Sequence, residues 1–344
     1  MEISKRDSFE RYLNKFDVIY LDITWFITRS KNKGENVVLD IQTAVIDELR
    51  KYYLNCVDED ETFLPDALLS VSHKMGNQFI IIIDEWDALF REAKNDEALQ
   101  KEYVQLLRGL FKGGTSTDET IAAAYMTGIL PIKKYGTESA LTDFQEFSMT
   151  TPGRLAEYVG FTEDEVKQLC DEYHMDFDEM QSWYDGHSFS RMKHVYGPNS
   201  VMKSIREEEI SNYWTQTETF ESLKEYIGMD FDGLKDAIIK MLGGERISVR
   251  ISTFQNDITS FNNKNDVLTL LIHLGYLAYD AAKREVYIPN FEVAEAFEDA
   301  VSGQEWGAVG EALSASEKLL AICRSRFSAS QRYRQACDDH RAEI

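Results

Sequence analysis

Cysteine is scarce in this 344-residue sequence, which contains four of them, all far apart. Cys56, Cys170, Cys323 and Cys337 form no C-x-x-C pair, which argues against a disulfide framework or a zinc knuckle as the basis of the fold. Isolated cysteines are typical of free thiols in a reducing compartment. We therefore expect a cytoplasmic protein.

Long apolar runs are also absent. The longest, around 79–83 and 121–132, have the length of a strand, whereas a membrane-spanning helix needs about 18 or more consecutive apolar residues. The opening MEISKRDSFERYLNKFD is charged where a signal peptide requires an apolar stretch. The sequence thus predicts neither a membrane span nor a secretory signal, which again favours the cytoplasm.

Positive charge is in deficit, since 37 Lys and Arg face 60 Asp and Glu and give a formal net charge of −23. Broad attraction to nucleic acid or to an anionic membrane needs a cationic surface, so the composition argues against both as partners. The chain is nevertheless 43% apolar and 12% aromatic, unlike a disordered acidic chain. At about 150 residues per domain, we expect about two globular domains.

Several catalytic motifs are missing as well. The sequence contains no H-E-x-x-H, no G-x-S-x-G and no G-x-G-x-x-G. It also contains no G-x-x-x-x-G-K-[ST], because the dipeptide Gly-Lys does not occur. Without this glycine-rich cradle and its lysine, about four charge-assisted hydrogen bonds to phosphate are lost, and nucleotide affinity should fall on the order of 10⁴-fold. We therefore expect weak ATP binding at most.

The first 150 residues contain a regular alternation of strands and helices, which is typical of a parallel α/β sheet with crossover helices. Strands are predicted at 17–23, 79–84, 121–129 and 144–149, and helices at 38–54, from Pro65 onward and around 103–111. The strand FIIIID (79–84) is apolar on both faces, which predicts that it lies between two helix layers. The predicted fold class is thus α/β, with a three-layer, P-loop NTPase-like core over 1–152.

After Pro152-Gly153 the sequence becomes acidic and mostly helical, up to about residue 230. Thr162 and Glu165 have the spacing of a capping box, in which each side chain binds a backbone N–H at the start of a helix. Residues 153–230 are therefore predicted as a helical segment.

The region 231–305 contains two helical stretches followed by a strand pair, LAYD and EVYIP. This order is compatible with a winged-helix-like module. The predicted hairpin carries two basic residues, Lys283 and Arg284, so a DNA-associated function is a less favoured alternative. The last segment, 306–344, is predicted as a helical linker and an atypical basic tail.

The strongest candidate site follows the strand at 79–84, where the sequence reads FIIIIDEWDALF. Ligands of parallel sheets bind beyond the carboxyl ends of the strands, which places Asp84 and Glu85 at such a site. This is the Walker B arrangement of P-loop ATPases, with Asp84 at Mg²⁺ and Glu85 orienting or deprotonating the attacking water. The alternative is an ordinary strand end whose acids cap the next helix. Asp87 fits a solvated acid in the first helical turn.

A second polar position follows the next predicted strand, where AAAYM runs into Thr127-Gly128. In P-loop ATPases the strand beside Walker B ends in a polar residue that senses the γ-phosphate. Alternatively, Thr127 caps the strand end and Gly128 permits a turn. Together, Asp84, Glu85 and Thr127 form a coherent candidate site.

An ordered set of motifs runs through the chain, including DVIYLDITWF, QFIIIIDEWDALF, AAYMTGILPIKKYG, GFTEDEVKQLC and VYIPN. In this order the motifs closely resemble the bacterial AAA-ATPase-like domain family over roughly residues 8–305. Members of that family are often fused to a C-terminal PD-(D/E)XK nuclease-like domain. The resemblance implies ATP binding and hydrolysis, with Mg²⁺ and ATP as cofactors. It also implies that Asp84 binds the metal, Glu85 is catalytic and Thr127 lies at the nucleotide.

The sequence departs from that family in two places. Family members carry a strand and an R-P-R-R-F-G-K-[ST]-type P-loop ahead of the segment that matches SFERYLNKFD, and neither this loop nor the nuclease-like domain occurs in the 344 residues. We therefore expect a truncated copy with weak or no ATPase activity. The P-loop strand normally lies inside the sheet, so the edges of 121–127 and 144–149 are expected to be unpaired. Unpaired edges invite association, and the alternative function is a non-catalytic module that self-associates or binds a protein partner.

Overall fold

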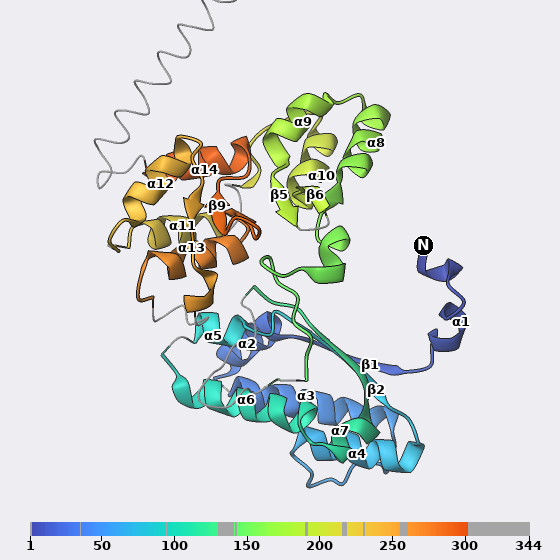
Figure 1. Cartoon of the computed structure of the whole chain (residues 1–344). Coiled ribbons are helices and arrows are strands. Elements are labelled where there is room, and N and C mark those ends of the chain that lie inside the picture. Colours follow the sequence, from blue (N-terminus) through green and yellow to red (C-terminus); the bar gives the residue numbers. More distant parts are fainter. Residues whose placement is uncertain are drawn as a thin grey trace, which may run out of the picture. The chain divides into compact units, whose positions relative to one another are not determined.

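The computed structural model describes residues 2–34, 36–93, 95–129, 141, 143–189, 192–214, 219–229, 231–254 and 261–301. They form two compact units that divide between Ser148 and Met149 (Figure 1). We call the described residues up to Ser148 unit 1 and the later ones unit 2. The predicted segment 306–344, with Cys323 and Cys337, lies outside the described residues.

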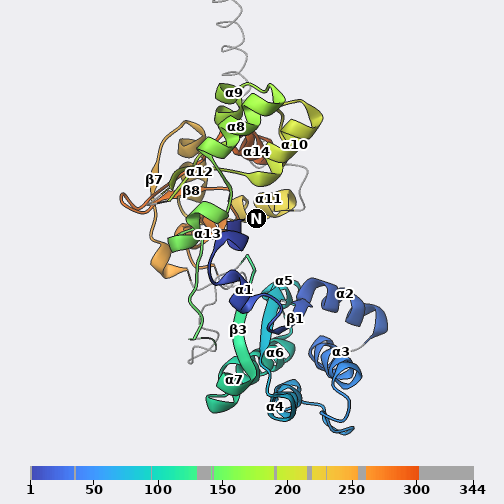
Figure 2. The same ribbon diagram turned by 90° about the vertical axis from the view of Figure 1, so that its right-hand side faces the viewer.

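Unit 1 is built on a parallel sheet of three strands. These are β1 (Asp17–Asp22), β2 (Phe79–Asp84) and β3 (Ile121–Met126), which lie side by side in the order β1-β2-β3 (Figure 2). Asp22 is the register partner of Asp84, and Ile83 is that of Met126, so the three strands end at nearly the same level. The predictions of these three strands are confirmed.

Helices connect the strands of unit 1. They are α1 (Phe9–Tyr12), α2 (Ile23–Lys33), α3 (Val37–Tyr52), α4 (Leu64–Met75), α5 (Ala88–Glu92), α6 (Glu97–Phe111) and α7 (Thr115–Thr120), preceded by the 3₁₀ turn η1 (Glu2–Lys5). The side chain of Asn36 accepts the backbone N–H groups of Val38 and Leu39, which starts α3. Gly34 adopts the left-handed conformation that ends α2. α2 begins at Ile23, directly after the last residue of β1, and so it starts at the carboxyl end of the sheet.

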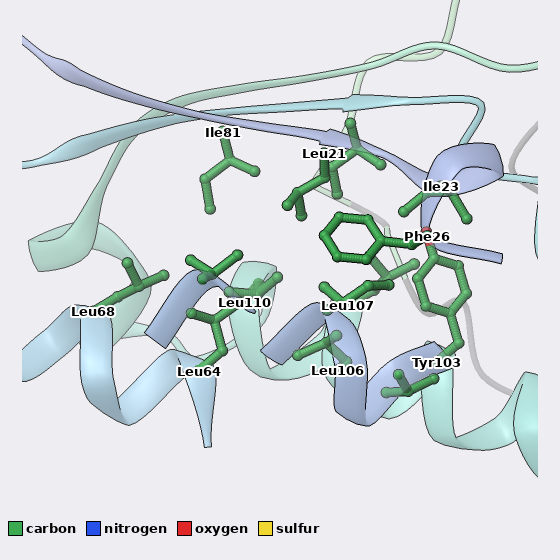
Figure 3. Packing of buried hydrophobic residues seen from close by; sticks show 14 of the residues in the cluster. Leu21, Ile23, Phe26, Leu64, Leu68, Ile81, Tyr103, Leu106, Leu107 and Leu110 are labelled. Atoms are coloured by element: carbon green, nitrogen blue, oxygen red, sulfur yellow. The ribbon is translucent and has the colours of Figure 1, made fainter. Parts of the chain in front are cut away.

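One face of the sheet is covered by helices. Leu21 and Ile81 point from the strands toward Leu64, Leu107 and Leu110, which come from α4 and α6 (Figure 3). In Figure 1, α3, α4, α6 and α7 all lie on this side of the sheet. The buried core of unit 1 therefore lies between one face of the sheet and one layer of helices.

The opposite face is open within unit 1. Val18, Tyr20 and Tyr125 are 56%, 57% and 56% exposed. Ile82, the register partner of both tyrosines, is partly exposed between them. The expectation of a second helix layer over FIIIID is therefore wrong for the described residues of this unit. Among the described residues of unit 1, the core thus has two layers where three were expected, because exposed side chains and no helix occupy the second face of the sheet.

The fourth strand expected at 144–149 is not formed, and its described residues contain an isolated bridge at Ser148 in place of a ladder. Phe144 packs its ring edge-on against Phe111 of α6, with the ring centroids 5.0 Å apart. The apolar pattern that suggested a strand is thus explained by packing against a helix.

The first part of unit 2 combines three helices with a small antiparallel sheet. Its elements are η2 (Gly153–Tyr158), β4 (Phe161–Thr162), α8 (Glu163–Tyr173), α9 (Phe177–Tyr184), β5 (His187–Phe189), β6 (Met192–Tyr196) and α10 (Pro198–Glu207), with the strands in the order β4-β6-β5. The capping box is confirmed, because Thr162 and Glu165 each accept the other's backbone N–H. The small sheet was not predicted, since its strands of two to five residues are too short for a periodic pattern.

The second part of unit 2 holds four helices and another antiparallel sheet. Its elements are α11 (Thr219–Ile227), α12 (Leu234–Leu242), β7 (Ile247–Ser248), η4 (Ile251–Thr253), α13 (Lys264–His273), β8 (Ala278–Asp280), β9 (Glu285–Tyr287) and α14 (Phe291–Val301), with the strands in the order β7-β9-β8. The predicted strand pair is confirmed as the hairpin of β8 and β9, and the winged-helix interpretation stays a prediction. In the described part of the chain, no helix is both long and apolar enough to cross a membrane.

Candidate functional site

Three strand ends meet at one edge of the unit 1 sheet. Asp22 ends β1, Asp84 ends β2, and Thr127 follows β3. The backbone N–H of Thr127 donates to the carbonyl of Ile83 at 2.9 Å, which continues the strand pairing past the end of β3. Because ligands of parallel sheets bind beyond the carboxyl ends of the strands, this edge is the candidate site.

Asp84 is the centre of the site. Its Oδ1 accepts the hydroxyl of Thr127, and its Oδ2 accepts that of Tyr20, whose Oη lies 2.9 Å away. The backbone N–H of Glu85 also donates to Oδ1, at 3.2 Å. The hydrogen bond from Thr127, and after it the bond from Tyr20, lowers the pKa of Asp84, because both stabilise the carboxylate. Asp84 is thus held as an anion by one hydroxyl from each side.

Glu85 is placed differently. Its backbone φ of 51° lies in the left-handed region, and this turns the chain away from β2. The backbone N–H of Trp86 then donates to the carbonyl of Thr127 at 2.9 Å. The carboxylate of Glu85 forms an ion pair with Arg91 of α5. Burial raises the pKa of Glu85, and the charge of Arg91 opposes that rise.

Asp87 is buried, so the expectation of a solvated acid at this position is wrong. Its Oδ2 lies 3.1 Å from Nε of Arg91, and its Oδ1 accepts the backbone N–H of Ile129 at 3.3 Å. Arg91 therefore pairs with both Glu85 and Asp87. A Cβ at Gly128 would lie 2.5 Å from Oδ1 of Asp87, so this close approach requires glycine. Asp87 thus ties the loop after β3 to the start of α5.

Of the three predicted site residues, Asp84 and Thr127 are brought into direct contact, whereas Glu85 is bound to Arg91. Tyr20 and Arg91 were not predicted as members of the site. Tyr20 lies two residues before the end of β1 and therefore shares a face with Asp22, the last residue of that strand. This alternation of side chains is a sequence signal that could have indicated Tyr20 as a member of the site. Arg91 reaches Glu85 across a turn, and no sequence period indicates that contact.

The oxygen atoms at this edge suit Mg²⁺. Asp84 offers a carboxylate and Thr127 a hydroxyl, and Mg²⁺ typically binds through one or two carboxylates while keeping several waters. Asp22 is used differently, since its side chain accepts the backbone N–H of Trp25 at 2.9 Å and caps α2. Among the described residues, no three His, Cys, Asp or Glu side chains gather into a metal cage. The site therefore fits a Mg²⁺ ion that retains most of its water.

The fold and the site together define a class of protein. Unit 1 is a parallel α/β unit with an ionised aspartate and a hydroxyl at the carboxyl ends of its strands. Within that class, residues 1–137 match the AAA-ATPase-like family, which is described as "Predicted AAA-ATPase". This part of the chain is thus similar to the AAA-ATPase-like family, and the match covers less than half of the 344 residues.

The chain is also similar to a protein from Azotobacter chroococcum mcd 1 described as "Uncharacterized protein in vnfD 5'region". The two are 23% identical over 167 residues, which are 48% of this chain and 32% of that protein. The matched part of this chain thus spans about a third of the length of the relative. The description of that protein names no activity and no substrate.

Proposed function

We propose that unit 1 carries the metal- and water-binding half of an AAA-type ATPase site. The strongest support is the environment of Asp84. Its carboxylate accepts a hydrogen bond from the hydroxyl of Thr127 on one side and from that of Tyr20 on the other. An aspartate kept ionised at the end of the central strand is the group that a nucleotide-bound Mg²⁺ needs. The match of residues 1–137 to the AAA-ATPase-like family supports the same function.

Each of three side chains has a distinct role in this proposal. Asp84 holds Mg²⁺, which when bound neutralises charge on the phosphates. Glu85 orients or deprotonates the attacking water, and a pKa raised by burial suits a group that accepts a proton near neutral pH. Thr127 positions Asp84 and senses the γ-phosphate. Since Arg91 now binds the carboxylate of Glu85, that carboxylate must leave Arg91 before it can act as a base.

We further propose that these 344 residues hydrolyse ATP weakly or not at all. They contain no Gly-Lys dipeptide and therefore no P-loop cradle for phosphate. The start of α2, which lies at the same edge, is already capped by the carboxylate of Asp22. The loss of about four charge-assisted hydrogen bonds weakens nucleotide binding on the order of 10⁴-fold. The chain thus keeps the side chains for catalysis without tight binding of the substrate.

Titration of the whole chain with Mg-ATP tests this function, with phosphate release and the unfolding temperature as readouts. We expect a small thermal shift and slow phosphate release. Glu85→Gln should abolish the release, because its side chain cannot accept the proton. Glu97→Gln is the matched control, since Glu97 is an exposed residue of α6 whose carboxylate pairs with Lys101. Release that continues unchanged in Glu85→Gln would contradict the role of Glu85.

Binding of Mn²⁺, followed by its electron paramagnetic resonance signal, tests the metal site without any hydrolysis. Asp84→Asn should lose the bound ion, whereas Glu97→Gln should keep it. Equal binding by the two variants would show that Asp84 is not a metal ligand. Tight Mg-ATP binding with rapid hydrolysis by the wild type would overturn the proposal of weak activity.

A protein-interaction function is the second candidate, and the sheet itself favours it. β1 and β3 are the outermost of the three strands, so their outer edges pair with no strand of the described residues. Such edges can add a strand from another chain, and we propose a second copy as that chain. The net charge of −23 opposes self-association, so sedimentation should show more dimer as salt screens the charge. A monomer at low and high salt alike would contradict this function.

A further inference from the structure

Unit 1 contains a cavity away from the strand ends. Its volume is about 390 Å³, and it lies between α2, α5, α6 and the first residues of α3. Cavities that bind small molecules have volumes of about 300–1,000 Å³. None of Asp84, Glu85 and Thr127 lines this cavity, so it is a separate place from the proposed ATPase site.

The floor of the cavity is apolar. Ile27 of α2, Val37 of α3 and Leu89 of α5 line it, and all three side chains are buried. Leu99 of α6 adds a partly exposed wall. An apolar ligand that displaces water from this floor gains free energy from the surface it removes from water. The cavity therefore has a place for the hydrocarbon body of a ligand.

The rim of the cavity is charged and mostly negative. Among its described residues, Glu92, Asp96 and Glu102 carry carboxylates, and Lys31 carries the one ammonium group. Nζ of Lys31 lies 2.8 Å from Oε2 of Glu92 and joins α2 to α5. The side-chain amide of Asn36 donates to Oε2 of Glu102 at 2.8 Å and joins the start of α3 to α6. The carboxylate of Glu102 is thus bound by a neutral donor at the edge of the cavity.

We propose that this cavity binds a small organic cation, namely a primary ammonium group on an apolar aliphatic or aromatic body. The body occupies the floor formed by Ile27, Val37 and Leu89. The ammonium group, which has three donors, binds Glu102 and competes with Lys31 for Glu92. Specificity follows from the rim, because a neutral analogue cannot form a charge-assisted hydrogen bond with Glu102 and an anionic analogue is repelled by the excess of carboxylates.

Three probes that share a phenylethyl body test the proposal on the whole chain: 2-phenylethylamine, 2-phenylethanol and 3-phenylpropionate. Thermal unfolding and calorimetric titration at fixed pH and ionic strength are the readouts. We expect the amine to raise the unfolding temperature as its concentration rises. The alcohol should bind about tenfold more weakly, and the carboxylate should not bind. Equal binding of the alcohol and the amine, or no binding of the amine, would overturn the proposal.

Two variants locate the site. Glu102→Gln keeps an oxygen that can accept from Asn36 but removes the charge, so the amine should bind about tenfold more weakly while the alcohol is unaffected. Glu97→Gln removes an equal charge from the same helix outside the cavity and should bind like the wild type. Ala98→Trp, at an exposed position of the rim, should fill the cavity and abolish binding of both probes. Amine binding that is unchanged in Glu102→Gln would overturn the assignment, even if Ala98→Trp fails to fold.

Discussion

The two faces of the unit 1 sheet come from the same strands and have opposite surroundings. On one face, Ile81 and Ile83 lie in a buried core that α4 and α6 complete (Figure 3). On the other face, Tyr20 and Tyr125 flank Ile82, and both tyrosines are more than half exposed. One residue along the strand therefore decides whether a side chain lies in the core or at the surface.

The difference explains where the candidate site lies. Because side chains alternate along a strand, Ile82 and Asp84 share the face that the unit 1 helices leave open. Tyrosine suits this face, since its ring packs over the strands while its hydroxyl reaches a polar partner. The hydroxyl of Tyr20 binds Asp84 in this way. Asp84 thus lies at the end of the open face and is partly exposed.

The largest expected effect comes from a matched pair of substitutions in β2. Ile81→Ala removes a side chain that is 1% exposed and leaves a cavity in the core, so we expect a loss of about 2–5 kcal/mol in the free energy of unfolding. Ile82→Ala removes the same atoms from the partly exposed face, so the loss should be about 1 kcal/mol. Urea unfolding of both variants and the wild type measures the difference.

Equal losses in the free energy of unfolding of Ile81→Ala and Ile82→Ala would contradict the difference between the two faces of the sheet. Such a result would mean that Ile82 is buried in solution, and hence that something covers the open face.

The positions of the strands could be predicted, whereas the number of layers around them could not. The run FIIIID predicted β2 to the residue, as Phe79–Asp84. A run of apolar residues on both faces does not state what packs against each face, and this is why a second helix layer was expected. Phe144 shows the same limit, because its apolar side chain packs against Phe111 without strand pairing.

At the candidate site, sequence could predict the residues that end apolar strands but not those that reach them from elsewhere. Asp84 and Thr127 follow apolar runs and are visible for that reason. Tyr20 requires the register of β1 against β2, and Arg91 requires the left-handed turn at Glu85. The roles of Asp84, Glu85 and Thr127 in binding metal, water and nucleotide stay predictions.

A smaller effect is expected where the open face ends, at the hydroxyl of Thr127. Thr127→Val removes the strongest influence that lowers the pKa of Asp84. At pH 7 we expect a loss of about 1 kcal/mol in the free energy of unfolding, because the bond is charge-assisted but partly exposed to water. A lowered pKa means that this stabilisation is complete above the ordinary aspartate pKa of about 4 and is lost as the pH falls through the lowered value. Urea unfolding between pH 7 and pH 3 follows the difference.

Thr28→Val is the matched control for this pH dependence. The hydroxyl of Thr28 donates to the backbone carbonyl of Thr24 at 3.1 Å, a neutral acceptor, so the effect of its removal should not change with pH. If the deficit of Thr127→Val also stays constant down to pH 3, the bond to Asp84 does not stabilise its carboxylate. The end of the open face at Asp84 would then contribute no pH-dependent stability.

The smallest effect on stability is expected on the open face at β3, an outer strand of the sheet. Tyr125→Thr keeps a residue that favours strands and removes an exposed ring, so the free energy of unfolding should change by about 0.5 kcal/mol or less. Nile red fluorescence should nevertheless fall, because the dye binds exposed apolar surface. Tyr52→Thr is the control, since Tyr52 is 75% exposed at the end of α3, away from the sheet. If Tyr125→Thr and Tyr52→Thr leave the dye signal equally unchanged, Tyr125 is shielded in solution, and the two faces of the sheet differ less than the structure implies.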